Sequence, residues 1–409
     1  MPLVLRYFFP FIDFSSSEWS SLARTLRWLT LIWAIFGLVV MFSASYPVAE
    51  IEAGDGFYFF KRQLVWLFVG LVLFNKIVHT SLRTLLGYAP WFLFVFLFGI
   101  SLTLVPGLGT SINGATRWIA LGPVALQPSE LIKPFLILQS ACIFSQWFRL
   151  SWQDRLSWLG VFGMVIAMVL LQPNLSTASL CGMLIWLIAL AAGLPYVQLL
   201  ATAVMGLGVA AFSVSQNSYQ WKRITSFLDP WADTKEHGYQ LVQSLMAIGS
   251  GGTWGTGFGL SHQKLLYLPI QHTDFIFAVF AEEFGLVGGI CLLLFLAAYA
   301  TLGLMVALQA TRSVYKLVAI GAIVLLIGQS LINIGVATGA LPTTGLPLPL
   351  FSYGGNSMLS SLITAGLLVR VARESHRAEV VSLPGAEESE SFELSETAEL
   401  LPFPSGNPR

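Results

Sequence analysis

Long apolar runs separated by short polar segments dominate the chain. A helix needs about 20 apolar residues to cross about 30 Å of hydrocarbon, and ten runs reach or approach that length. Only the short breaks at 172–175 and 193–196 divide the fifth, sixth and seventh runs. The pattern predicts an all-α polytopic membrane protein of about ten transmembrane helices. The runs are 26–45, 62–78, 86–105, 128–147, 156–172, 176–194, 196–215, 275–306, 316–338 and 355–372.

Composition agrees with this pattern. The chain is 56% hydrophobic and 10% charged, whereas soluble domains carry about 25% charged residues. The formal net charge is zero, so no basic field favours nucleic acid as a partner. The cysteines Cys142, Cys181 and Cys291 lie in apolar runs, which is typical of small core residues rather than of a disulfide framework or a metal site.

The distribution of Lys and Arg predicts the orientation, because cytoplasmic loops carry the excess of these residues. We expect both termini in the cytoplasm and the long polar connections outside, including a large loop, 216–274, between the seventh and eighth spans. On the side of the termini lie Arg6, Arg24, Arg27, Lys76, Arg83, Arg149, Arg155, Arg312, Lys316, Arg370, Arg373 and Arg377. On the other side lie Lys61, Arg62, Arg117, Lys222, Arg223, Lys235 and Lys264.

Three segments follow from this topology. Residues 1–25 form a cytoplasmic or interfacial N-terminus that is aromatic and broken by Pro10. Residues 26–373 form the ten-span membrane domain. Residues 374–409 form a cytoplasmic tail, which is acidic and rich in Ser and Glu and which we expect to be disordered.

Three carboxylates mark the start of the eighth run, in LYLPIQHTDFIFAVFAEEFGLVGG. Carboxylates at membrane depth are costly, so they are kept for a reason. Asp274 is interpreted either as a helix N-cap or as a general base at the outer mouth of the bundle. Glu282 and Glu283 lie about 12 Å deeper along a helix, and we expect them to support the bundle.

The other outer segments leave alternatives open. Arg117 beside Trp118 could bind a diphosphate or anchor the chain at lipid headgroups. Glu130 and Lys133 share one helix face, either as a buried ion pair or as a cation kept at the mouth of a cavity. The glycines of 247–260 favour a re-entrant turn over a phosphate cradle, because the Lys-Ser or Lys-Thr of a nucleotide loop does not follow them.

Two elements are predicted within these segments. Residues 239–248 fit a short amphipathic helix in the outer interface. The last outer loop carries Pro342, Pro347 and Pro349, and prolines stiffen the backbone. Irregular backbone is tolerated at membrane depth only beside protein or a wet cavity. We therefore expect a rigid re-entrant lid that lines the same cavity as Asp274.

These segments together resemble the SEDS family (shape, elongation, division and sporulation), ten-span membrane proteins that include FtsW and RodA. The resemblance extends over nearly the whole membrane region, in the family's order, and is greater to the FtsW branch. The matching stretches are NGATRWIALGPVALQPSELIK (113–133), QPNLSTA (172–178), GYQLVQSLMAIGSGG (238–252), LPIQHTDFIFAVFAEEFGLVGG (268–289) and LPLPLFSYGGNSML (346–359).

The resemblance implies a peptidoglycan glycosyltransferase that polymerises lipid II outside the plasma membrane, with Asp274 as the catalytic carboxylate. The 4-hydroxyl of the acceptor sugar attacks the anomeric carbon of the donor, and the lipid diphosphate leaves in one inverting step. That step needs a base and positive charge but no nucleophilic second carboxylate. The cations assigned to the diphosphate are Arg117, Lys133 and Arg223. The further candidates for the pocket wall are Gln127, Ser129, Glu130, Gln243, Ser352 and Tyr353.

The resemblance also implies partners and leaves functional alternatives. It implies a class B penicillin-binding protein (an FtsI-like transpeptidase), other divisome proteins and membrane lipids as partners, at the division septum. The resemblance implies no certain cofactor, and a divalent cation, Mg²⁺ or Mn²⁺, stays open. The alternatives are a lipid II flippase, a non-catalytic divisome scaffold and a RodA-like elongation role. The chain departs from the family pattern, without affecting Asp274, at Asn174, Ser176, Ile270, Thr344 and Asn356.

Overall fold

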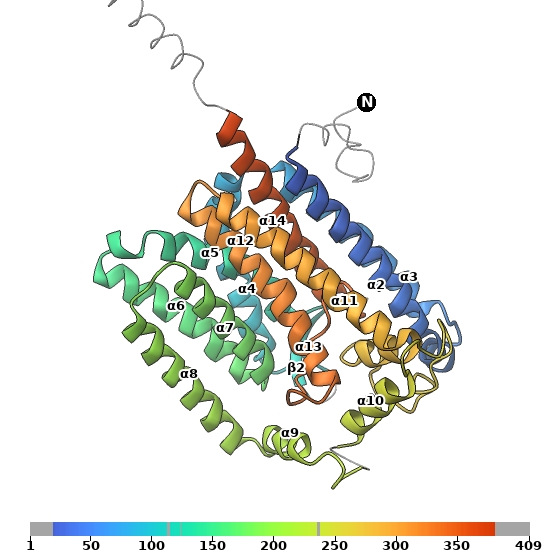
Figure 1. Cartoon of the computed structure of the whole chain (residues 1–409). Coiled ribbons are helices and arrows are strands. Elements are labelled where there is room, and N and C mark those ends of the chain that lie inside the picture. The colour runs from blue at the N-terminus through green and yellow to red at the C-terminus, as the bar shows by residue number, and fades with distance from the viewer. Residues whose placement is uncertain (1–18, 113–114, 123, 235–237, 381–409) are drawn as a thin grey trace, which may run out of the picture.

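The computed structural model describes residues 19–112, 115–122, 124–234 and 238–380, and helices make up most of them (Figure 1). The helices are α2 (Ser21–Ala53), α3 (Tyr58–His79), α4 (Leu82–Thr103), α5 (Pro128–Ser145), η3 (Trp147–Arg149), α6 (Trp152–Leu171), α7 (Leu175–Ala191), α8 (Tyr196–Gln216), α9 (Ser218–Leu228), α10 (Tyr239–Ser250), α11 (Ile276–Gln309), α12 (Ser313–Ile323), η4 (Val324–Gly328), α13 (Gln329–Ala337) and α14 (Gly355–Val380).

The predicted apolar runs each coincide with a helix, and the run 316–338 corresponds to the continuous series α12, η4 and α13. Among the described residues, eight helices are long and apolar enough to cross a membrane. The polytopic all-α architecture is therefore confirmed. The helix α7 is shorter than these eight, and α5 carries Glu130 and Lys133, so the count of ten spans stays a prediction.

Local chemistry fixes the ends of α2, which extends beyond its predicted run. Ser20 accepts a hydrogen bond from the backbone N–H of Ala23 at 3.2 Å, as an N-cap residue does. Gly54 ends the helix in the left-handed conformation, with φ +66°, which glycine adopts without strain. These caps make α2 longer than its apolar stretch alone.

The first and last described helices meet at one end of the bundle. The Ser20 hydroxyl donates to the carbonyl of Ala372 at 3.4 Å, and Arg373 lies 4.1 Å above the ring of Trp19. The helix α14 continues to Val380, beyond the predicted start of the tail at residue 374. Residues 1–18 and 381–409 lie outside the described residues, and the assignment of this end to the cytoplasm stays a prediction.

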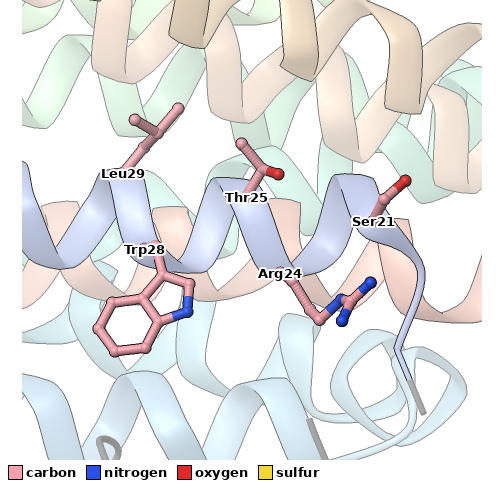
Figure 2. A pocket seen from close by; sticks show the side chains of 5 residues that line it. All are labelled: Ser21, Arg24, Thr25, Trp28 and Leu29. Atoms are coloured by element: carbon pink, nitrogen blue, oxygen red, sulfur yellow. The ribbon is translucent and has the colours of Figure 1, made fainter. Parts of the chain in front are cut away.

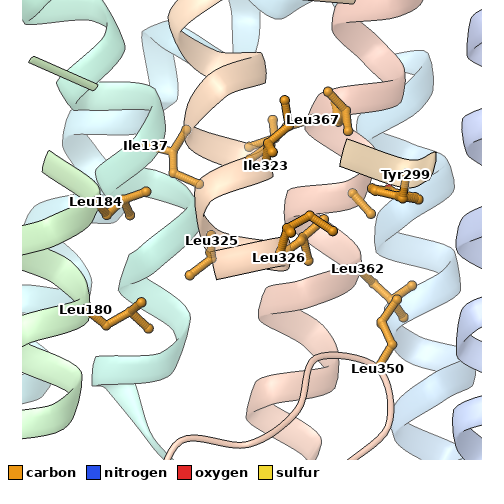
Figure 3. Packing of buried hydrophobic residues seen from close by; sticks show 14 of the residues in the cluster. Ile137, Leu180, Leu184, Tyr299, Ile323, Leu325, Leu326, Leu350, Leu362 and Leu367 are labelled. Atoms are coloured by element: carbon orange, nitrogen blue, oxygen red, sulfur yellow. The ribbon is translucent and has the colours of Figure 1, made fainter. Parts of the chain in front are cut away.

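The helix α14 is the centre of the bundle, and it packs against α3, α12, α5 and α2. Figure 3 shows residues of the buried apolar cluster, to which α14 contributes Leu362 and Leu367 and to which α5, α7, α11 and α12 contribute others. Gly321 allows close approach here, since a Cβ atom at this position would lie 2.7 Å from Ile137. Small residues at helix contacts are how membrane bundles gain packing without a hydrophobic driving force.

Two parts of the outer segments differ from a plain loop. Residues 107–127 contain an antiparallel sheet of order β1-β2-β3, formed by β1 (Gly109–Ile112), β2 (Ala115–Leu121) and β3 (Val124–Leu126). No sheet was predicted there, because a sheet depends on pairing between strands that no local pattern shows. Within 216–274, α10 confirms the predicted amphipathic helix and α9 is an additional one.

The helix α11 is interrupted at Gly285, whose φ of +66° and ψ of −167° are not helical. The glycine-rich segment fills the interruption: the N–H groups of Thr256 and Gly257 donate to the carbonyls of Glu282 and Glu283. In return, the N–H groups of Leu286 and Val287 donate to the carbonyls of Gly252 and Thr253. The glycines therefore allow the backbone of this segment to approach the backbone of α11 closely. This agrees with a re-entrant turn rather than with a phosphate cradle.

Candidate active site

Asp274 lies in the turn just before α11, outside the helix. Phe275 occupies the N-cap position, and no side chain caps this helix end. The interpretation of Asp274 as a cap was therefore wrong, because the chain turns once more before the helix begins at Ile276. The carboxylate is thus available for another role.

The proline-containing lid packs against the Asp274 segment, as predicted. The Ser352 hydroxyl donates to the carbonyl of Thr273 at 2.5 Å, and the N–H of Tyr353 donates to the carbonyl of His272 at 2.8 Å. A Cβ atom at Gly345, which has φ +72°, would lie 3.5 Å from Asp274 Oδ2. Two ends of the lid therefore hold the segment that carries the carboxylate.

The lid also enters the bundle, and this confirms its re-entrant path. A Cβ atom at Gly37 would lie 2.1 Å from the carbonyl oxygen of Leu350, and Gly37 lies midway along α2. Leu350 has a positive φ of 63°, which is uncommon for a residue other than glycine. The buried side chains of Leu346, Leu348 and Phe351 anchor this path.

The surroundings of Asp274 make its carboxyl a weaker acid than an ordinary aspartate. The residue is partly buried, and burial raises its pKa to about 6, although Arg223, Arg117 and the Thr273 hydroxyl each lower it. A carboxylate with a pKa near the working pH is suited to accept a proton. The structure thus brings three predicted site residues together, namely Asp274, Arg117 and Arg223.

Arg223 reaches this site from α9. Its guanidinium lies 4.6 Å from the centre of the Tyr219 ring and donates to the Tyr219 hydroxyl at 2.6 Å and to the carbonyl of Thr343 at 3.2 Å. Tyr219 is one helical turn away on α9, so it orients the charge. Since Thr343 belongs to the lid, Arg223 joins α9 to the lid near the carboxylate.

Arg117 reaches the site from β2 and is held by backbone. It donates to the carbonyls of Gln172 and Pro173 at 3.1 and 2.6 Å. Burial and then the charge of Arg223 lower its pKa. Neighbouring guanidinium groups are suited to bind an anion with more than one charge. The role of Arg117 toward an anion stays a prediction.

Glu130 and Lys133 form a buried ion pair with a 2.7 Å separation. Lys133 also donates to Gln329 Oε1 at 3.2 Å, and Gln329 Nε2 donates to the carbonyl of Pro347 in the lid at 2.8 Å. The predicted shared helix face is confirmed. Among the described contacts, the pair reaches the Asp274 region through Gln329 and the lid rather than directly.

The remaining predicted residues line different parts of this region. Gln127 donates to the buried Ser129 hydroxyl at 3.5 Å at the start of α5. The Tyr353 ring lies 5.0 Å from the Phe59 ring. Gln243 is partly buried on α10, a helix that packs against α11 and α13. Their roles toward a substrate stay predictions.

His272 packs between two aromatic rings beside the candidate base. Its ring centre lies 4.8 Å from that of Phe59 and 5.6 Å from that of Tyr353. Burial lowers its pKa to about 4, so the imidazole is neutral at physiological pH. This arrangement suits a packing role for His272 rather than that of a cation.

Glu282 and Glu283 support the bundle, as expected. Glu282 accepts from the Ser261 hydroxyl and from the N–H of His262 at 2.9 Å. Glu283 accepts from Lys264 at 2.8 Å and from the Ser43 hydroxyl at 2.6 Å. Both carboxylates are therefore committed to fixing the segment that precedes Asp274.

Two polar residues in an apolar run escaped the sequence reasoning. Asn333 Nδ2 donates to the carbonyls of Asp274 and Leu346, both at 2.8 Å, and Gln329 contacts Lys133 and Pro347 as described above. Their spacing of four residues places them on one helix face. Amides one turn apart within a hydrophobic span were the signal that could have found them.

Two observations bear on other sites. Within the described ranges, no group of three or more His, Cys, Asp or Glu side chains could hold a metal ion, and a divalent cation stays an open alternative.

The cavity in Figure 2 lies near the start of α2, away from the lid. It is lined by Ser21, Arg24, Thr25, Trp28 and Leu29.

Comparison with known proteins gives relatives along most of the chain. The probable peptidoglycan glycosyltransferase FtsW of Synechocystis sp. is 56% identical over 380 residues, which are 93% of this chain and 96% of that protein. The putative peptidoglycan glycosyltransferase FtsW of Cyanophora paradoxa is 51% identical over 374 residues, which are 91% of this chain and 93% of that protein. Stage V sporulation protein E of Bacillus subtilis is 35% identical over 350 residues, covering 85% and 96%.

Solved structures share the fold. A chain from a peptidoglycan synthase complex that coordinates polymerization and crosslinking superposes with a TM-score of 0.70 and 30% identity, covering 86% of this chain and 98% of that one. The rod shape determining protein RodA of Thermus thermophilus gives a TM-score of 0.63 at 30% identity, covering 86% and 97%. Residues 23–377 match the FtsW/RodA/SpoVE family of cell cycle proteins. The chain therefore belongs to the FtsW/RodA/SpoVE family.

Proposed function

We propose that this protein is a peptidoglycan glycosyltransferase that polymerises lipid II into glycan strands at the outer face of the plasma membrane. The observation that carries the proposal is the partly buried Asp274, whose pKa is raised to about 6 and which interacts electrostatically with Arg223 and Arg117 beneath a proline-containing lid. The relatives named peptidoglycan glycosyltransferase FtsW support the same activity.

The chemistry assigns one role to each charge. Asp274 accepts the proton of the acceptor 4-hydroxyl as the oxygen attacks the anomeric carbon of the donor. Arg223 and Arg117 stabilise the negative charge that develops on the leaving lipid diphosphate. A single displacement inverts the anomeric carbon and needs one base, and Glu282 and Glu283 are already engaged in structural contacts. The charge requirement of the reaction is therefore met without a second free carboxylate.

The location of the charges favours polymerisation over transport. Substrate sites of secondary transporters lie near the middle of the membrane, whereas Asp274 precedes α11 and Arg117 and Arg223 lie on β2 and α9, outside the candidate spans. This supports glycan synthesis above lipid II flipping. The outer location of this end of the bundle, with both termini in the cytoplasm, is part of the proposal.

The partner and the cellular role follow from the relatives. The structural neighbour in a synthase complex that couples polymerization to crosslinking supports a class B penicillin-binding protein as the partner of this chain. The higher identity to proteins named FtsW than to stage V sporulation protein E supports septal synthesis with other divisome proteins. An elongation role is the alternative, and a purely scaffolding role predicts that the charges around Asp274 are dispensable.

The experiment uses the purified protein with its transpeptidase partner in vesicles that contain labelled lipid II. Polymer length and lipid II flipping are followed in the same vesicles for the wild type and for Asp274→Asn. Asp55→Asn is the matched control, because Asp55 is a partly exposed aspartate in the turn between α2 and α3, where it pairs with Lys61 away from the Asp274 segment. We expect polymer from the wild type and the control and none from Asp274→Asn; full polymerisation by Asp274→Asn refutes the proposal.

A further inference from the structure

The series α12, η4 and α13 contains a π-helical turn at Val324–Gly328. Such turns are rare and are frequent at functional sites. An extra residue in a turn rotates the rest of the helix by about 100°. The two polar residues Gln329 and Asn333 follow directly after this turn, so the turn sets the direction in which both amides point.

Both amides are buried, with Asn333 1% and Gln329 3% exposed. Buried polar groups are usually hydrogen-bonded, and here both amide nitrogens have partners, whereas Asn333 Oδ1 has none among the described residues. The two hydrogens on Asn333 Nδ2 go to the carbonyl oxygen of Asp274 and to that of Leu346, each at 2.8 Å. A single side chain therefore connects the candidate base's own peptide group to the lid.

Gln329 makes the neighbouring connection one turn earlier. It accepts from Lys133 and donates to the carbonyl of Pro347, the lid residue next to Leu346. The buried ion pair of α5, the lid and the Asp274 segment are thus joined along one face of α13. Of the two amides, only Asn333 contacts Asp274 itself.

We propose that Asn333 is a positioning residue for glycan synthesis, which holds the backbone of Asp274 at a fixed place relative to the lid. This inference rests on the proposed function. Asn333 acts through Asp274 and needs no contact with substrate. Misplacing a catalytic group by about 1 Å lowers a rate by about 100-fold. The hydrogen bond from Asn333 to the Asp274 carbonyl is the contact from α13 that positions the Asp274 backbone.

The test compares Asn333→Leu with two controls. Ser330→Ala removes a buried hydroxyl on the same helix whose bond stays within the helix, to the carbonyl of Leu326. Asn333→Asp keeps the size of the side chain. An ionised carboxylate donates no hydrogen bond and a protonated carboxyl donates one, so at most one of the two bonds from Asn333 is kept. If Asn333→Leu does not fold, Asn333→Asp is measured in its place.

We expect kcat for polymerisation to fall by about 10-fold to 100-fold in Asn333→Leu, with KM for lipid II within about threefold of the wild type. Hydrogen exchange should rise together in 270–276 and 343–350. Gln329→Leu should raise exchange in the lid segment alone. Ser330→Ala should match the wild type in each measurement.

The results separate the two proposals. If Asp274→Asn is inactive while folded Asn333→Leu or Asn333→Asp keeps the wild-type kcat, the inference about Asn333 is overturned and the proposed function stands. If the Asn333 variants raise KM and leave kcat unchanged, the residue serves binding and the inference is likewise overturned. If Asp274→Asn polymerises normally, both proposals fall.

Discussion

Lys264 Nζ lies 2.8 Å from a carboxylate oxygen of Glu283, and both side chains are buried in the bundle. The same lysine donates to the Ser43 hydroxyl of α2 at 2.9 Å. One cation therefore joins α2, the segment before Asp274 and the first part of α11. Since Glu283 lies two residues before the interruption at Gly285, the pair stabilises the chain where the helical hydrogen bonds of α11 are interrupted.

Lys264→Met should destabilise the protein strongly, because the Glu283 carboxylate then stays buried without its counter-charge. Breaking a buried pair in this way costs about 3–5 kcal/mol. Thermal unfolding of the purified protein in detergent measures the loss. The double variant Lys264→Met/Glu283→Gln removes both charges and should recover most of the stability; equal stabilities for the single variant and the wild type would contradict the role of the pair.

Gly285→Ala should also destabilise the fold, for a steric reason. A Cβ atom at Gly285 would lie 2.3 Å from the backbone nitrogen of Gly255, and the position has φ +66°. Backbone in this region costs residues other than glycine about 1–3 kcal/mol, before the clash is counted. Gly289→Ala is the matched control, since its Cβ would meet only Phe277 at 4.0 Å. A Gly285 variant as heat-stable as the control would disprove the explanation.

The rate of polymerisation should fall as the pH drops through about 6, because Asp274 must be ionised to act as a base and burial raises its pKa to about 6. A pH–rate profile of kcat/KM, taken where the wild type stays folded, gives the midpoint. An acidic limb centred near pH 4 would show that the carboxyl is not buried in the working enzyme.

The same pKa shift predicts a change in stability with pH. The folded-state pKa of Asp274 lies above its ordinary value of 3.8, so the folded protein binds this proton more tightly than the unfolded chain does. The resulting contribution to the free energy of unfolding is fully present below about pH 4 and is lost as the pH rises through about 6. The asparagine of Asp274→Asn does not ionise, so the variant is not destabilised as the pH rises. It should therefore be more heat-stable than the wild type at pH 7. The difference between the two should shrink toward pH 4.

Arg223→Gln should move the acidic limb to higher pH, since Arg223 is the largest of the influences that lower the pKa of Asp274. The rate at its plateau should also fall, because one cation near the leaving diphosphate is lost. Lys222→Gln, an exposed neighbour on α9, removes an equal charge and should leave the midpoint in place. A limb unmoved in Arg223→Gln would mean that the two groups do not interact.

The helices could be predicted from sequence because each depends on its own apolar residues. The lid was also predictable, since Pro342, Pro347 and Pro349 stiffen their own neighbourhood. Asp274 was predicted as the base through the family resemblance, and the pairing of Glu130 with Lys133 followed from helical spacing. These features depend on residues close together in the chain.

The features that escaped prediction depend on distant partners. The sheet β1-β2-β3 forms through pairing between strands. The interruption at Gly285 is stable because 252–257 supplies the missing hydrogen bonds. The role proposed for Asn333 depends on the carbonyls of Asp274 and Leu346 both lying within hydrogen-bond distance of its amide nitrogen. No local pattern encodes which distant backbone groups will meet.

The lid's contact with Gly37 also bears on how a lipid-linked sugar is accommodated. The lid runs from Gly345, next to the Asp274 carboxylate, to Leu350, whose carbonyl lies against Gly37 in the middle of α2, and the side chains of Leu346, Leu348 and Phe351 are buried along it. A diphosphate held at the carboxylate has protein rather than acyl chains directly beneath it. On the proposed function, we expect a polyprenyl tail attached to that diphosphate to leave sideways between helices, in the plane of the membrane.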